Sequence, residues 1–380
     1  MLKKILINGI TLEGANLVPL LLKIRTWQTF DCEITVFGNS LLKEQIDSLN
    51  IIREYKFIEL KNTNKSNNQF NFIFEYLRRN LYCLLYFKIL KNKYDVIYSI
   101  SSVLDLIIFP YILKKVDKNI KWVTVFDNIV PFTDPGNKFI RFLAWSFFQI
   151  SLIFLKKADI IFAISQDLKF FLLKRGFREN QIVVTGNAVE VDLIRQAQKD
   201  EKYNIDALFI GRINETKGIY DMLKVLKIVK EKYPDFRLAI MGKGGEVTEK
   251  QFKKKITDMG LENNIHFLGY TPRSEKFNII KSSRCFWFLS KSESESFGIA
   301  LLEAVCCGLP AFAYDLQPYK HIYRNNEVMI FNKNDYKSVA ERVIEIFDEK
   351  KFANENGKLL LGKYSWDQIA EIEYNTFKNL

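Results

Sequence analysis

Short β-branched or aromatic runs alternate with longer helical patterns along the chain, and this alternation constrains the fold more than any other feature. It is typical of repeated strand–helix–strand units, which form parallel sheets covered by helices. Runs that predict strands lie at residues 4–7, 33–37, 96–99, 122–126, 160–164 and 182–184, and then at 207–210, 237–241, 266–268, 285–289 and 311–314. The chain therefore predicts an α/β fold with two Rossmann-like, doubly wound parallel sheets in tandem.

A length of 380 residues also favours two domains over one. We expect the first domain over residues 1–190 and the second over residues 204–365. A polar segment within residues 191–203, rich in Gln, Lys, Asp and Glu, is expected to be the linker. The helical pattern of residues 366–380 is expected to cross back and pack on the first domain.

The net charge of +12 is concentrated in the first half of the chain. Residues 1–190 hold 26 lysines and arginines against 17 aspartates and glutamates. Such an excess fits an anionic partner, either a membrane surface, a nucleic acid or a phosphorylated substrate, although a lysine-rich, solvated surface would give the same count. Because no nucleic-acid recognition motif is present, we expect no nucleic-acid partner.

The five cysteines are odd in number, scattered and mostly within apolar runs, which indicates reduced thiols of a cytoplasmic protein. The first residues contain only a short apolar run and no pattern of a signal peptide. We therefore expect a cytoplasmic location, at the inner face of the cell membrane.

Residues 139–155 are apolar and aromatic, but Arg141 interrupts them, and a spanning helix needs about 20 apolar residues. We therefore expect either a buried helix of the first domain or an interfacial helix with basic flanks at Lys138, Lys156 and Lys157. The helical pattern at residues 70–90 has the same style. Both segments lie in the basic half, so we expect peripheral contact with an anionic membrane.

Glu303 is the one charged residue of an otherwise apolar helical run over residues 297–307, which Gly308 and Pro310 end. A carboxylate on such a helix needs a partner, either a structural cation or a ligand. Glu295 lies just before the helix, whose first amides attract anions, phosphate above all. Two hydroxyl-binding carboxylates beside an anion-binding helix start would suit a sugar nucleotide.

Basic residues follow the predicted strand at 207–210. Arg212 and Lys217 stand at the two ends of one loop and could reach the same anion, although the spacing of a Walker loop is absent. Gly244 follows the next strand, where it would let a nucleoside approach the backbone. Gly14 opens the first helix, where it would let a phosphate approach.

The sequence offers little to a metal ion. No Asp-x-Asp pair occurs, and hard cations prefer clustered carboxylates. The two histidines, His266 and His321, are too few for a typical zinc site or a histidine-based triad. We therefore expect no metal and no cofactor.

With these motifs the chain resembles the retaining, nucleotide-sugar-dependent glycosyltransferases of the GT-B class that carry a Glu-x7-Glu signature (glycosyl transferases group 1). The matching motifs are Gly211-Arg212 with Lys217-Gly218, Gly242-x-Gly244, Phe267-Leu268-Gly269-Tyr270, Glu295-Ser296-Phe297-Gly298 through Leu302-Glu303-Ala304, and Gly308-Leu309-Pro310. The resemblance implies two domains facing across a cleft. The first would bind the acceptor and the second the nucleotide sugar.

The resemblance also implies roles for single residues. Arg212 and Lys217 would hold the donor diphosphate, Glu303 the ribose hydroxyls and Glu295 the hydroxyls of the transferred sugar. Further donor-binding residues would be Gly14, Gly244, Tyr270, Phe297 and Gly298. The donor would be a UDP- or GDP-hexose, and the acceptor a glycan or a lipid-linked saccharide. Transfer would retain the anomeric configuration and need no metal.

One departure from the family pattern affects the first domain. Where members often carry a histidine before an aspartate, this chain has Phe126 before Asp127. Asp127 could substitute for that histidine, so we list it with Glu295 as a catalytic candidate. Two alternatives remain open: a sugar-nucleotide epimerase on a related scaffold, or an inactive protein that only binds a nucleotide sugar.

Overall fold

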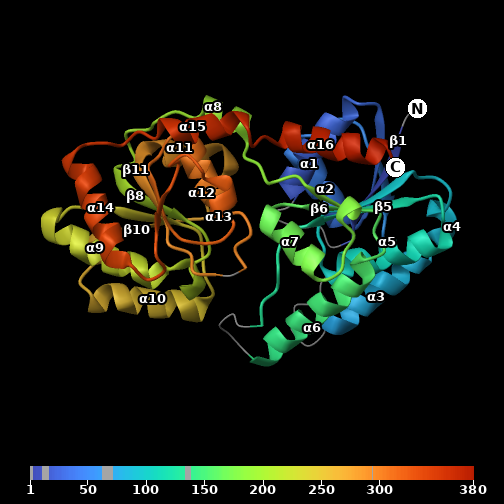
Figure 1. Cartoon of the computed structure of the whole chain (residues 1–380), viewed down its shortest axis with the longest axis horizontal. Coiled ribbons are helices and arrows are strands. Elements are labelled where there is room, and N and C mark those ends of the chain that lie inside the picture. Colours follow the sequence, from blue (N-terminus) through green and yellow to red (C-terminus); the bar gives the residue numbers. More distant parts are fainter. Residues whose placement is uncertain (1–2, 11–16, 62–71, 133–137, 293) are drawn as a thin grey trace. The chain divides into compact units, whose positions relative to one another are not determined.

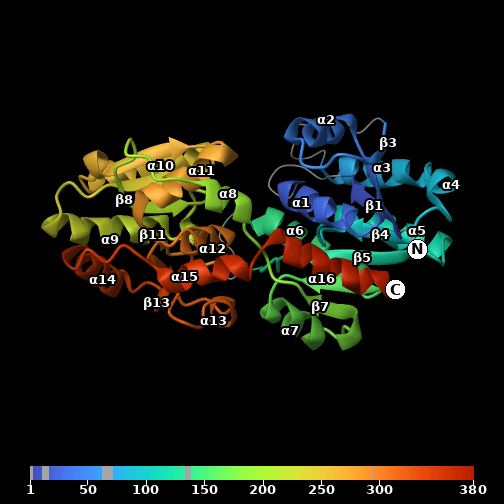
Figure 2. The ribbon, with the colours of Figure 1, turned by 90° about the horizontal axis from the view of Figure 1, so that it is seen from above.

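A computed structural model describes residues 3–10, 17–61, 72–132, 138–292 and 294–380. The chain divides into two compact units (Figure 1). Unit 1 comprises residues 1–132, 136–187 and 366–380, and unit 2 comprises residues 133–135 and 188–365. Each unit is a sheet with helices on both faces (Figures 1 and 2).

Unit 1 is built on seven parallel strands in the order β3-β2-β1-β4-β5-β6-β7. The strands are β1 (Lys3–Gly9), β2 (Cys32–Gly38), β3 (Lys56–Glu59), β4 (Val96–Ser99), β5 (Lys121–Phe126), β6 (Ile160–Ala163) and β7 (Ile182–Val184). The helices are α1 (Leu17–Gln28), α2 (Ser40–Leu49), α3 (Phe72–Leu84), α4 (Phe87–Leu90), α5 (Leu104–Val116), α6 (Lys138–Leu155), α7 (Gln166–Lys174) and α16 (Trp366–Lys378).

Unit 2 repeats this plan with six parallel strands in the order β10-β9-β8-β11-β12-β13. The strands are β8 (Ile205–Ile210), β9 (Leu238–Met241), β10 (Ile265–Gly269), β11 (Ser283–Phe288), β12 (Ala311–Tyr314) and β13 (Met329–Phe331). The helices are α8 (Val191–Gln196), α9 (Ile219–Lys232), α10 (Glu246–Asp258), α11 (Arg273–Ser282), α12 (Ile299–Cys306), α13 (Tyr319–Ile322), α14 (Tyr336–Asp348) and α15 (Glu355–Leu359). The two doubly wound sheets confirm the predicted fold class.

In each sheet the strand order reverses beside the first strand, between β1 and β4 in unit 1 and between β8 and β11 in unit 2. Doubly wound folds bind ligands at such a switch point, outside the carboxyl ends of the strands. The central strands are buried on both faces, which explains why they appear in the sequence as continuous apolar runs.

Two strands escaped the sequence analysis, β3 and β13, and both lie at sheet edges. Their residues are exposed or half-buried throughout, so no continuous apolar run marks them. The helical pattern predicted over residues 70–90 is divided in the structure, into α3 and α4.

The segment expected to be a linker, residues 191–203, begins with a helix. Val191–Gln196 form α8, which belongs to unit 2 and contacts α11. Ile194 is buried by this packing. The local composition is polar because the helix buries only one of its six residues.

The last helix, α16, belongs to unit 1, where it lies along α1 (Figures 1 and 2). The ammonium of Lys23 on α1 pairs with the carboxylate of Glu373 on α16 at 3.0 Å. The Tyr98 hydroxyl donates to the same carboxylate at 2.9 Å, and the Trp27 indole donates to the Ala370 carbonyl at 2.9 Å. A buried polar network therefore joins the two ends of the chain.

Candidate functional site

The loop between β8 and α9 places the two predicted phosphate ligands at the carboxyl edge of the second sheet. Gly218 closes the loop with φ of +74°, and a Cβ there would lie 1.9 Å from the carbonyl oxygen of Leu289. Only glycine fits this position. Lys217 immediately precedes Gly218 and is half-buried. Arg212 is exposed, and no described residue forms an ion pair with the Arg212 guanidinium.

Lys217 reaches across the sheet edge to Glu295, with which it forms a hydrogen-bonded ion pair. The side chains are 18% and 12% exposed, so both charges are largely removed from water. The Lys217 ammonium also lies 5.5 Å from the centre of the Phe288 ring, and the Ser290 hydroxyl donates to Glu295 at 3.3 Å. Two segments of the Glu-x7-Glu resemblance, 78 residues apart, therefore meet in one polar cluster.

The start of α12 lies beside this pair and has free capacity for an anion. Gly298 precedes the helix with φ of +72°, and no side chain caps the first turn. A Cβ on Gly298 would lie 3.1 Å from the hydroxyl oxygen of Tyr319. That hydroxyl is buried and has no hydrogen-bond partner among the described residues. Burial raises the pKa of Tyr319 well above its usual range, so the hydroxyl remains a donor that a ligand could satisfy.

Glu303 has the partner that its burial requires. Its carboxylate accepts a hydrogen bond from the ammonium of Lys276 on α11 at 2.6 Å. Burial raises the pKa of Glu303, the Lys276 charge opposes the rise, and the nearby Glu190 carboxylate adds to it. Glu190 is itself paired with Arg273. In this structure Glu303 therefore forms a structural ion pair. A ligand that binds Glu303 would contact a carboxylate already paired with Lys276.

Gly244 and Tyr270 lie on two loops that a backbone hydrogen bond joins, because the Gly242 amide donates to the Gly269 carbonyl at 2.9 Å. A Cβ on Gly244 would lie 2.5 Å from the Ile213 carbonyl oxygen, so this position also requires glycine. The Gly244 amide donates to the carboxylate of Glu249 at 2.6 Å. Tyr270 is 84% exposed, which leaves its ring available for stacking.

Phe297 differs from the other predicted donor contacts. Its side chain is buried and packs edge-to-face on Tyr364, with ring centres 5.7 Å apart. The ring therefore belongs to the core beneath the site, where it supports the start of α12.

Asp127 belongs to unit 1, where it follows β5 at the carboxyl edge of the first sheet. Its carboxylate accepts a hydrogen bond from the Ser101 hydroxyl at 3.0 Å. Burial raises the pKa of Asp127, and the hydrogen bond from Ser101 opposes the rise. Phe126, which stands where the family often has histidine, is fully buried and stacks on both Phe148 and Phe171. Gly14 lies outside the described residues.

Unit 2 thus brings Lys217 and Glu295 into contact at the carboxyl edge of its sheet, just before Gly298. Arg212 follows β8 at the same edge, and Glu303 lies on α12, where it pairs with Lys276. In the described ranges, no three His, Cys, Asp or Glu side chains form a group that could hold a metal ion.

Two residues of this site were missed by the sequence analysis, Lys276 and Tyr319. Lys276 lies on α11, which also carries Lys281, and lysines are common throughout this chain. Nothing in the sequence therefore distinguished Lys276 as the partner of Glu303. Tyr319 begins a four-residue helix, α13, and resembles any core aromatic residue in the sequence. The apolar environment of Glu303 predicted that a partner exists but not which residue provides it.

Comparisons with known proteins identify similar glycosyltransferases. Residues 190–358 match the family model described as glycosyl transferases group 1. An uncharacterized glycosyltransferase of Methanocaldococcus jannaschii is 28% identical over 325 residues, which are 81% of this chain and 74% of that protein. A phosphatidyl-myo-inositol mannosyltransferase of Mycobacterium leprae is 29% identical over 194 residues, but the match spans only half of its length and 48% of this chain.

Solved structures show the same fold. HepE of Anabaena, crystallised in complex with UDP and glucose, superposes over 100% of both chains with a TM-score of 0.76 at 14% identity. Sucrose-phosphate synthase of Thermosynechococcus elongatus superposes over 100% of this chain and 99% of its own, also with a TM-score of 0.76 and 14% identity. At such identities the likeness establishes the fold alone.

Proposed function

We propose that this chain is a group 1 glycosyltransferase, because residues 190–358 match that family model. It would transfer a hexose from a UDP- or GDP-sugar to a glycan or lipid-linked saccharide, with retention of anomeric configuration. The observation that carries the proposal is the cluster at the start of α12. There Lys217, Glu295 and the Tyr319 hydroxyl, which has no hydrogen-bond partner among the described residues, lie close to a helix start whose first residue follows an uncapped Gly298.

The proposed mechanism follows from the charges of this cluster. The donor diphosphate would draw Lys217 away from Glu295, and Arg212 would approach from the exposed side of the loop. These two cations and the amides of α12 would stabilise the charge on the leaving diphosphate. Glu295, freed from Lys217, would accept hydrogen bonds from the sugar hydroxyls. Glu303 would accept them from the ribose, beside Lys276.

The acceptor hydroxyl would attack from the same face that the leaving group departs, which retains the configuration. A donor phosphate oxygen would assist in removing the proton of that hydroxyl. We propose Asp127 as the unit 1 residue that takes the place of the family histidine. The relative Phosphatidyl-myo-inositol mannosyltransferase and a GDP-mannose:cellobiosyl-diphosphopolyprenol alpha-mannosyltransferase of Xanthomonas oryzae, 25% identical over 171 residues and 44% of its length, support a lipid-linked acceptor.

The first test is a donor screen in the presence of EDTA. We expect thermal stabilisation and slow donor hydrolysis with UDP- or GDP-hexoses, and EDTA is expected to leave the activity largely intact, because two cations and a helix start take the place of a metal. Complete loss of activity on chelation, restored by Mn²⁺, would contradict the metal-independent mechanism. Failure of every nucleotide sugar to bind would contradict the proposed donor class.

The two glutamates are expected to respond differently to substitution. Glu295→Ala should lower kcat by about ten- to a hundredfold, because the transferred sugar changes geometry in the transition state. Glu303→Ala should raise the donor KM by about tenfold with a smaller change in kcat, because the ribose is remote from the reacting bond. Steady-state kinetics measure both parameters.

Glu246→Ala is the matched control, since Glu246 is an exposed glutamate of the same unit. Because Glu303 is buried and paired with Lys276, its variant must first be shown to fold, by thermal melting. If both variants melt and transfer sugar like the wild type, the proposed roles of the two glutamates are wrong.

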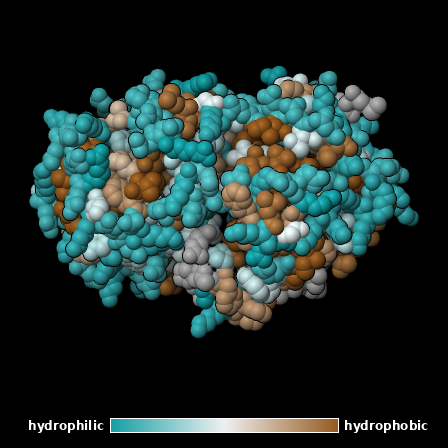
Figure 3. All heavy atoms as spheres, in the orientation of Figure 1, coloured by the Kyte–Doolittle hydropathy of each residue, from teal (hydrophilic) through white to brown (hydrophobic). Residues whose placement is uncertain are grey.

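We also propose that unit 1 touches the cytoplasmic face of an anionic membrane through α6. Among the described helices, α6 alone is long and apolar enough to cross a membrane by length and composition, yet only 22% of it is buried. Phe142, Ile150 and Ile153 recur at helical spacing on one exposed face, and hydrophobic side chains gather over this helix (Figure 3). Phe148 and Leu152 are buried on the opposite face. One face of α6 thus packs on unit 1, and the other presents apolar side chains to solvent.

Such a face with basic flanks suits an interfacial helix. The protein is therefore expected to co-sediment with phosphatidylglycerol vesicles, less at high salt, because salt screens the charges. Phe142→Ser combined with Ile153→Ser should reduce sedimentation, whereas Val247→Ser combined with Leu359→Ser, two exposed apolar residues of unit 2, should not. Equal sedimentation of the two double variants would show that α6 is not the contact.

A further inference from the structure

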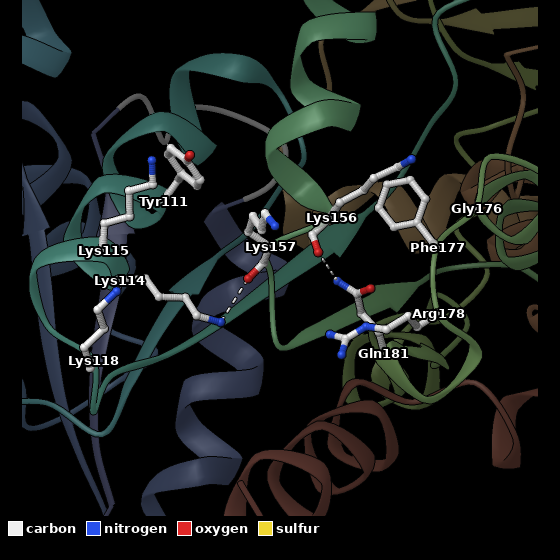
Figure 4. A pocket seen from close by; sticks show the side chains of 10 residues that line it. All are labelled: Tyr111, Lys114, Lys115, Lys118, Lys156, Lys157, Gly176, Phe177, Arg178 and Gln181. Atoms are coloured by element: carbon white, nitrogen blue, oxygen red, sulfur yellow. Dashed lines mark hydrogen bonds between the residues drawn. The ribbon is translucent and has the colours of Figure 1, made fainter.

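A basic pocket of about 620 Å³ opens on unit 1, and no residue of the proposed donor site lines it (Figure 4). Two of its lysines, Lys156 and Lys157, also follow α6. The cations of the pocket come from three separate segments of the chain. They are Lys114, Lys115 and Lys118 at the end of α5, Lys156 and Lys157 after α6, and Arg178 after α7.

The pocket lies at the amino edge of the sheet. Lys118, Lys157 and Arg178 stand three or four residues before β5, β6 and β7 respectively, whereas Asp127 follows the carboxyl end of β5. The length of a strand, roughly 15–20 Å, therefore separates the pocket from the ligand-binding edge of unit 1. It is also confined to unit 1, whereas the proposed donor ligands are in unit 2.

The positive charge of the pocket is not neutralised from within the described part of the chain. Lys114 pairs with Asp159, the only carboxylate that contacts these six cations in the described residues. The Asp159 carboxylate also accepts a hydrogen bond from the Trp122 amide at 2.7 Å. The carboxyl ends of α5, α6 and α7 each contribute about half a negative charge. The six cations, Asp159 and the three helix ends together leave a net charge of about +3.5 around the cavity.

The walls of the pocket are held in place by hydrogen bonds, of which those from Gln181 are buried. The side-chain amide of Gln181, which is buried, donates to the Ala158 carbonyl at 2.6 Å and to the Leu155 carbonyl at 3.3 Å. The Lys114 ammonium donates to the Lys157 carbonyl at 2.9 Å. The turn that carries Lys156 and Lys157 is therefore fixed from both sides. Figure 4 shows Lys114 and Arg178 extending toward one another from opposite walls.

We propose that this pocket binds a phosphate-bearing anion with two or more negative charges, which Lys157 and Arg178 hold by charge-assisted hydrogen bonds. A guanidinium offers a fork of donors that matches two phosphate oxygens, and an ammonium adds a point charge. The volume lies within the range of small-molecule sites and accepts a pyrophosphate or a phosphorylated headgroup.

The test uses the full chain with inorganic pyrophosphate as the probe, in isothermal titration calorimetry. Lys157→Ala combined with Arg178→Ala should weaken binding at this site by at least about tenfold. Both side chains are exposed, so folding should not change. Lys43→Ala combined with Arg53→Ala removes the same two residue types from exposed positions of unit 1 and should leave binding unchanged.

Pyrophosphate could also bind at the proposed donor site, so a third variant separates the two. Arg212→Ala combined with Lys217→Ala should keep the pocket component of binding. The proposal is overturned if pyrophosphate binding disappears in this variant and persists in the Lys157/Arg178 variant. Equal binding to the wild type and the Lys157/Arg178 variant would overturn it as well.

A second experiment, with vesicles, distinguishes a lipid headgroup from a free phosphorylated molecule. If the pocket binds a lipid headgroup, pyrophosphate should reduce co-sedimentation of the protein with phosphatidic acid vesicles. The Lys157/Arg178 variant should then co-sediment less than the Lys43/Arg53 control. If pyrophosphate binds in the pocket but sedimentation is the same for these two variants, the ligand is a free phosphorylated molecule.

Discussion

Replacing Glu373 by alanine is expected to lower the free energy of unfolding of unit 1 by roughly 3–5 kcal/mol, the range for breaking a buried ion pair. The side chains of Lys23 and Glu373 are only 5% and 1% exposed. Burial raises the pKa of Glu373, and the Lys23 ammonium opposes that rise. Without the carboxylate, the Lys23 charge would stay buried with the Tyr98 hydroxyl as its remaining hydrogen-bond partner among the described residues. Differential scanning calorimetry of the unit 1 transition measures the loss.

Glu371→Ala is the matched control, because Glu371 is an exposed glutamate of the same helix. Its transition should move little. Replacing the whole pair, Lys23→Met with Glu373→Leu, should recover much of the stability, since no buried charge then remains. If Glu373→Ala melts like Glu371→Ala, the pair does not hold α16 on unit 1.

Replacing Lys217 by alanine is expected to lower kcat/KM for the nucleotide sugar by about 10- to 150-fold, which corresponds to roughly 1.5–3 kcal/mol for a charge-assisted hydrogen bond. Two contributions disappear together in this variant. The diphosphate loses a cation, and Glu295, whose side chain is 12% exposed, loses its ion-pair partner. Steady-state kinetics with the donor found in the screen measure the effect.

Arg212→Ala should lower kcat/KM by a similar factor but should not change the melting temperature, because Arg212 is exposed. Lys217→Ala should lower both. Lys227→Ala, an exposed lysine on α9, is the matched control and should behave like the wild type. Wild-type kcat/KM in both the Arg212 and Lys217 variants would remove these residues from the donor site.

Much of the fold and part of the candidate site could be predicted because their signals are local. A strand buried on both faces appears as a short apolar run, and a buried helix shows its one carboxylate, Glu303, plainly. The loop from Gly211 to Gly218 is likewise marked by residues that lie next to one another. The edge strands β3 and β13 were missed because half-exposed strands lack this pattern.

The sequence by itself predicted the two doubly wound sheets and singled out Lys217, Glu295 and Glu303 as candidate ligands. Only the tertiary structure decided which side chains meet: Lys217 with Glu295, Lys276 with Glu303, and Lys23 with Glu373 across 350 positions. It also gathered the cations of the basic pocket from three segments. The physical reason is that such contacts depend on strand order and on how helices pack, which the periodicity within one segment does not encode.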